Sequence, residues 1–243
     1  MPEEKYNIVS REDGVRIEWD DVKSQLNVQG DGHCEIKNIF GALAMSGNVQ
    51  LKTDFIQNGA VVSGNCELDA ESIGMHAWSM NNASIRVADW VYSAKSSDAS
   101  LFKTKSATDI DARDDSTIEA EEVSDKAVSM DKSYVKVGKC RIAVSIGESL
   151  LEAGEIRREA DCFDKSKLFA EEINGDVNVL MNGTVDVGIV HGDVGGLGDG
   201  TIRADYIGGN ILAGSATGGS ENVTVEVGER KLDEDDTEES IKP

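Results

Sequence analysis

The sequence predicts an all-β fold: a single-stranded parallel β-helix, or β-solenoid, of about twelve coils of about 17 residues each, right-handed and three-sided. Three observations predict it. Apolar positions recur every 16 or 17 residues along almost the whole chain. Gly, Asn or Asp recurs at one fixed phase of that period. Within each period, apolar and polar residues alternate over short runs, which is typical of strands and not of helices.

The first apolar position of the repeat recurs twelve times. All twelve residues are apolar, whereas the 39% hydrophobic content would give about five by chance. The positions are Ile17, Cys34, Leu51, Leu68, Ile85, Phe102, Ile118, Val135, Leu151, Leu168, Val185 and Ile202. Because coils in the same phase stack like on like, we expect one buried column in a rod roughly 58 Å long, at about 4.8 Å per coil.

Two further apolar columns follow each start, five and nine residues later. The first is Val22, Ile39, Ile56, Ile73, Trp90, Ala107, Val123, Cys140, Ile156, Ile173, Val190 and Ile207. The second is Leu26, Leu43, Ala60, Ala77, Ala94, Ala127, Val144, Ala160, Val177, Val194 and Ile211. Asp111 interrupts the second column in a 16-residue coil, and we expect the adjacent Ile110 to take its place.

Turn-forming residues mark two corners of the coil. Thirteen residues after the start lie Gly30, Gly47, Gly64, Asn81, Asp98, Asp115, Asp131, Asp164 and Gly198. These residue types tolerate a left-handed backbone at small cost. Seven residues after the start lie Ser24, Gly41, Asn58, Gly175, Gly192 and Gly209. These corners suffice for a three-sided coil, and parallel crossovers are usually right-handed.

The repeat divides the chain into three parts. Residues 1–13 are expected to form an N-terminal half-coil or cap, with Val9 in the second strip and Asp13 at the turn. Residues 14–228 form the solenoid, in which GGSE (218–221) inserts about four residues before a closing coil at 222–228. Residues 229–243 are expected to be an acidic disordered tail. End coils expose strand edges, so either these segments cap the rod or its ends join other subunits.

Composition limits the partners. The 243 residues carry a net charge of −22, which argues against direct binding to nucleic acid or to an anionic membrane. The charge fits a basic partner or mimicry of DNA. The N-terminus lacks an apolar secretory core, and no run has the roughly 18 apolar residues of a membrane helix. We therefore expect a cytoplasmic or virion-associated protein without a membrane span.

No residue is predicted to be catalytic, cofactor-binding or metal-binding. The histidines His33, His76 and His191 lie in separate coils. The stretch GDVGGLGDG (192–200) lacks the Lys-Ser/Thr of a P-loop and opens no helix, so we interpret its glycines as corners.

Cysteines and carboxylates have structural interpretations too. Cys34, Cys140 and Cys162 replace apolar residues in inward columns, where a free thiol acts as a small hydrophobe; Cys66 completes the set. Acidic residues project outward and could suggest glycoside hydrolysis, but the uniform coils build no cleft. These are Glu119, Glu121, Glu122, Glu171 and Glu172.

The C-terminal coils carry a family resemblance. The segment EEINGDVNVLMNGTVDVGIVHGDV, with its G-D-V repeats, resembles the coils of bactofilins, which are polymer-forming bacterial cytoskeletal proteins. The segment GDGTIRADYIGGNILAGSATGGSENVTVEVG is similar to the end of the β-solenoid of flagellar assembly protein A. The resemblance is clearest over 170–228. It implies a scaffold role and brings no catalytic residues.

The sequence thus favours a non-enzymatic structural protein, a rigid rod that self-assembles or binds protein partners, possibly basic ones, through its ends. One alternative is a structural component of a virion or appendage. Another is an acidic inhibitor that mimics DNA, which the 17-residue period does not support.

Overall fold

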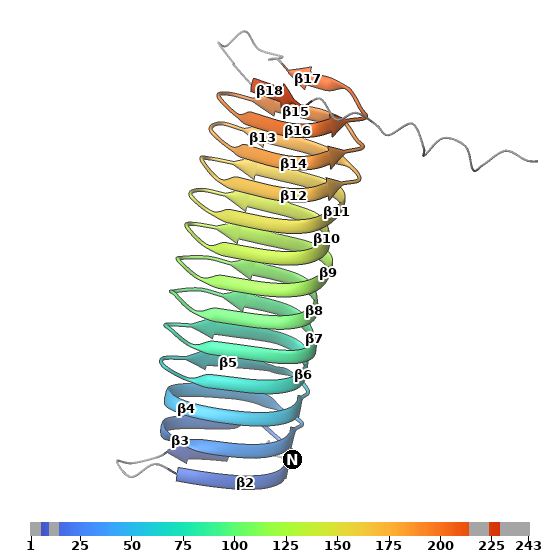
Figure 1. The fold of residues 1–243 in the computed structure, drawn as a ribbon. Helices are drawn as coiled ribbons and strands as arrows, with labels where there is room; N and C mark the ends of the chain where they lie inside the picture. Colours follow the sequence, from blue (N-terminus) through green and yellow to red (C-terminus); the bar gives the residue numbers. More distant parts are fainter. Residues whose placement is uncertain (1–5, 10–14, 214–223, 229–243) are drawn as a thin grey trace, which may run out of the picture.

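The computed structural model describes residues 6–9, 15–213 and 224–228, and they wind into a rod of stacked parallel coils (Figure 1). The described residues form eighteen strands in one sheet and contain no helix. The strands are β1 (Tyr6–Val9), β2 (Val15–Val22), β3 (Leu26–Ile39), β4 (Ala42–Ile56), β5 (Gly59–Ser63), β6 (Glu67–Met80), β7 (Ser84–Ser96), β8 (Leu101–Ala112), β9 (Thr117–Met130), β10 (Tyr134–Ile146), β11 (Leu150–Phe163), β12 (Lys167–Ile173), β13 (Asp176–Leu180), β14 (Thr184–Val190), β15 (Val194–Leu197), β16 (Thr201–Ile207), β17 (Ile211–Ala213) and β18 (Thr224–Val227).

The strand register confirms the predicted β-solenoid of about twelve coils. Leu51 pairs with Leu68, Leu68 with Ile85, and Ile85 with Phe102, so the first column stacks as expected. Its members from Cys34 to Ile202 are at most 2% exposed. The column is therefore the continuous spine of the core.

Each regular coil turns six side chains inward. In the coil that begins at Leu68 they are Leu68, Ala70, Ile73, Ala77, Ser79 and Ala83, all buried. Alternation of inward and outward residues breaks after the second, third and fifth of these, where two or three consecutive residues face outward. A chain that bends wherever alternation breaks has three sides, in agreement with the predicted cross-section. The right-handed winding stays a prediction.

Two residues assigned to inward columns were placed one position wrongly. Val91, not Trp90, lies between Ile73 and Ala107, because the register shifts by one residue between Val87 and Trp90. Trp90 faces outward and is exposed.

The second misassigned residue lies three coils further on. Ala143, not Val144, lies between Ala127 and Ala160, because the register shifts between Cys140 and Ile142. By contrast, Ile110 replaces Asp111 between Ala94 and Ala127 as predicted.

The corner thirteen residues after each start is left-handed, as predicted. All nine residues named there have positive φ. From Asn81 onward most of these corners use two successive positive-φ residues, such as Asp131 and Lys132. The amide of Ser133 then donates to the carbonyl of Met130 at 3.2 Å. This is the pattern of a type I′ turn, which reverses the chain in two residues.

Buried serines support these turns from inside the rod. The hydroxyl of Ser133 accepts from the amide of Met130 at 2.9 Å and donates to the carbonyl of Ala112, one coil away, at 2.9 Å. It also contacts the hydroxyl of Ser129 at 2.9 Å. The same arrangement recurs with Ser145 and Ser149. Each turn is thus tied to its neighbouring coil by polar groups that the search for apolar columns did not reveal.

The two ends agree in part with the sequence. β1 pairs with β3, but Val9 lies beside Gln29 instead of beside the second column, so its predicted place is wrong. The reason is that eleven residues separate Tyr6 from Ile17, against eight between the equivalent Leu26 and Cys34.

At the other end the closing coil is confirmed. β18 pairs with β16, with Val225 beside Ile202. The step of 23 residues is six longer than a coil, not about four. Asp13, the GGSE insertion and residues 229–243 lie outside the described residues.

Candidate functional surfaces

The histidines make separate surface contacts. His33 Nε2 lies 3.1 Å from the Glu35 carboxylate, and His191 Nε2 lies 3.0 Å from that of Glu172. His76 packs edge-on against the ring of Tyr92. Within residues 6–9, 15–213 and 224–228, no group of three His, Cys, Asp or Glu side chains is arranged to hold a metal ion.

The four cysteines are free and buried. Cys34, Cys140 and Cys162 occupy inward columns as predicted, and Cys66 occupies a sixth inward column that the sequence analysis did not identify. Burial raises the pKa of all four thiols, and that of Cys140 to about 12. Because the thiolate is the reactive form, these side chains are poor nucleophiles at neutral pH.

The glycine-rich stretch 192–200 forms a corner and strand β15. Gly192 packs so closely on the coil below that an added Cβ would overlap the backbone of Gly175. Beside it, the Asp176 carboxylate accepts from the amide of Asp193 at 2.9 Å, and that of Asp193 accepts from the amide of Asn210 at 2.7 Å. The G-D repeats therefore join successive coils, with the glycine at a corner as predicted.

The acidic residues singled out in the sequence lie on the rod surface with basic neighbours. Glu119 pairs with Lys103 at 2.7 Å, and Glu122 lies 3.4 Å from Arg157. Glu121 and Glu171 are exposed beside a shallow groove. These carboxylates are distributed over several coils and share their surface with cations.

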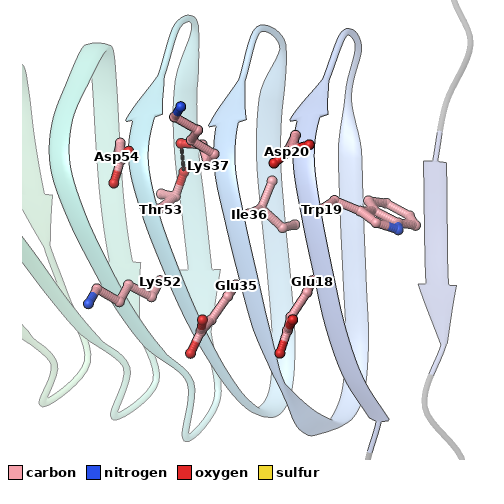
Figure 2. Close-up of a pocket in the computed structure, with 9 residues that line it drawn as sticks. All are labelled: Glu18, Trp19, Asp20, Glu35, Ile36, Lys37, Lys52, Thr53 and Asp54. Atoms are coloured by element: carbon pink, nitrogen blue, oxygen red, sulfur yellow. Dashed lines mark hydrogen bonds between the residues drawn. The ribbon is translucent and has the colours of Figure 1, made fainter.

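That groove runs along the first side of the coils. Figure 2 shows its N-terminal part, where Glu18, Glu35 and Lys52 form one row and Asp20, Lys37 and Asp54 form the other. Buried residues of β3 and β4, including Ile36, lie under the floor. Similar hollows recur between Arg86 and Glu171 and between Lys136 and Asp186. The groove thus follows from the pleat, because side chains before and after each inward residue point outward.

The N-terminal end of the rod exposes an indole. Trp19 pairs with Ile36 and belongs to the inward column two residues after the start, yet it is 40% exposed. In Figure 2 its ring extends beyond β2, on the side away from Ile36. Among the described residues, β2 pairs only with β3. The end of the column is therefore an apolar side chain at a strand edge.

The C-terminal end has an equivalent edge. Among the described residues β18 pairs only with β16, and β17 only with β15. Val225 is half-buried, whereas Ile211, Leu212 and Val227 are exposed. Both ends therefore combine open parallel strand edges with apolar side chains.

Comparisons with known proteins return no relative. No protein-family model matches the chain, and no curated protein or solved structure matches it. The β-solenoid fold is established by the strand register itself, and membership of the bactofilins or of the flagellar assembly protein A family stays a hypothesis. The described part of the chain also holds no helix with the length and apolar character that crossing a membrane requires.

Proposed function

We propose that this chain is a non-enzymatic structural protein, a rigid rod that assembles with further copies through its ends. The observation that carries the proposal is the pair of open parallel edges, β2 at one end and β17 with β18 at the other. Exposed strand edges template pairing with another chain unless they are blocked.

Head-to-tail joining of two rods would extend the columns already present. If β2 of one copy followed β18 of another, Ile17 would stack on Val225 and Trp19 on Val227, because each pair shares a position of the repeat. The joint would bury apolar side chains and satisfy main-chain groups in the manner of every internal coil.

The distribution of polar groups supports a structural role over catalysis. The histidines lie far apart, the thiols are protonated, and the groove is an open, repetitive consequence of the pleat. The resemblance of 170–228 to bactofilins fits the same role.

Charge should control this assembly. Glu18, Asp20 and Asp21 lie at the N-terminal end, and Asp205 and Glu226 at the C-terminal end. Bringing two acidic ends together is unfavourable, so salt should promote association, since the Debye length falls from about 10 Å at 0.1 M to about 3 Å at 1 M salt.

Sedimentation velocity of the full chain tests the proposal. We expect species larger than the monomer that increase with protein concentration and with salt. Val227→Asp should suppress them by placing a charge at the joint, whereas the matched control Val61→Asp, at an exposed valine on β5 in mid-rod, should not. A monomer at every concentration and salt would contradict the proposal.

A further inference from the structure

A cluster of exposed aromatic and sulfur-containing side chains lies on the second corner of two adjacent coils, on β6 and β7 (Figure 1). It consists of Met75, His76, Trp90 and Tyr92, called here the aromatic corner. The ring of Tyr92 lies edge-on to that of His76 at 5.8 Å and to that of Trp90 at 6.4 Å. Met75, Trp90 and Tyr92 are 46%, 37% and 45% exposed. The chain has only 5% aromatic residues, so their concentration at one corner is unusual for this surface.

A local change of register creates the aromatic corner. Trp90 pairs with Ser72 and Ser106, so one extra residue precedes it compared with neighbouring coils. Without that residue, Trp90 would point into the core in place of Val91. The next step, from Val91 to Ala107, is 16 residues and restores the phase. Such one-residue bulges re-aim a side chain, here an indole toward solvent.

Carboxylates surround this corner. Asp89 directly precedes Trp90, and Glu71, which precedes Ser72, lies next to it on the neighbouring coil. Asp109 pairs with Ser93 on the other side. Glu71 and Asp89 are exposed and Asp109 is half-buried. The corner thus presents aromatic faces within a ring of negative charge.

We propose that the aromatic corner is a lateral docking site for an arginine-bearing segment of a partner protein. A guanidinium can stack on the faces of Trp90 and Tyr92 while donating to a neighbouring carboxylate, a combination that suits arginine better than lysine. A second copy of the chain is a poorer occupant, because each copy carries a net charge of −22. This site does not depend on assembly through the ends.

Fluorescence anisotropy tests the site with two labelled peptides of equal length and charge. One alternates arginine with Gly-Ser pairs and the other has lysine in place of arginine. We expect the arginine peptide to bind more tightly, and Trp90→Ala to weaken it about fivefold or more, as loss of about 1 kcal/mol of cation–π attraction requires. Asp89→Asn should weaken it without altering the rings.

The controls separate the aromatic corner from diffuse charge. Phe169→Ala removes an exposed aromatic several coils away and should leave the affinity unchanged. Trp90→Phe keeps a ring and should retain most of the binding, and circular dichroism establishes that each variant is folded. Equal affinities for the wild type and Trp90→Ala, or for the two peptides, would overturn the proposal. Loss of self-association in Trp90→Ala would overturn it too, by assigning this corner to a second copy.

Discussion

At the scale of single residues, the interior is held together by hydrogen-bonded serines as well as by aliphatic packing. Ser129, Ser133, Ser145, Ser149 and Ser166 are at most 2% exposed, and their hydroxyls bond to the turn and to the next coil. A buried hydroxyl with partners costs little, whereas a turn amide without one costs more. These positions therefore depend on serine in particular.

Replacing one of these serines should destabilise the rod. Ser133→Ala leaves the amide of Met130 and the carbonyl of Ala112 without their side-chain partner, so we expect the free energy of unfolding in urea to fall by about 1–3 kcal/mol. Ser124→Ala, at an exposed serine one turn earlier, is the matched control and should change it by less than about 0.5 kcal/mol. Equal effects would refute the role of the turn serine.

The thiols predict a dependence of stability on alkaline pH. Burial raises the pKa of Cys140 to about 12, against about 8.5 in an unfolded chain, so the native state holds its proton longer. The stabilisation is complete below the unfolded pKa and is lost as pH rises from about 8.5 to 12. Urea midpoints measured across this range should fall, and Cys140→Val should reduce the fall.

Thiol chemistry gives an independent check on the same residues. Ellman's reagent at about pH 8 should react with the native chain only slowly and with four thiols after unfolding, because all four cysteines are buried. A fast reaction of any thiol in protein whose circular dichroism is unchanged would show that the thiol is accessible.

At the scale of strands and coils, the sequence predicts the columns well where the repeat keeps its length. It misplaces Trp90 and Val144, because a one-residue change of length can fall anywhere between two columns and a fixed offset from the start cannot locate it. Ile110 was assigned correctly because Asp111 was an evident misfit. The serine columns were missed because their side chains are polar and become compatible with burial only through their partners.

Coil deletion tests the repeat as a structural unit. Removing 118–134 deletes 17 residues and places Val135 on Phe102, so the variant should fold with a modestly lower urea midpoint, since solenoid stability is roughly a sum over neighbouring coils. Removing 118–125 instead puts Lys126 in the inward position of Ile118 and should abolish cooperative unfolding. If both variants behaved alike, the 17-residue phase would not be what specifies the core.

At the scale of the whole molecule, a sheet that continues from coil to coil leaves unsatisfied edges only where it stops. The sequence anticipated those ends, since it predicted both a starting half-coil and a closing coil. It could not anticipate the aromatic corner, because the offset that placed Trp90 inward hid the one feature that turns it outward. Candidate surfaces created by a register shift become visible only when the strand pairing is known.

Negative-stain electron microscopy of the full chain tests the central claim most directly. In about 0.5 M salt, where repulsion between acidic ends is screened, we predict filaments one rod wide and several times longer than a single rod of roughly 58 Å. The Val227→Asp variant should show single rods under the same conditions. Wild-type protein that shows only single rods at every concentration would contradict assembly through the ends.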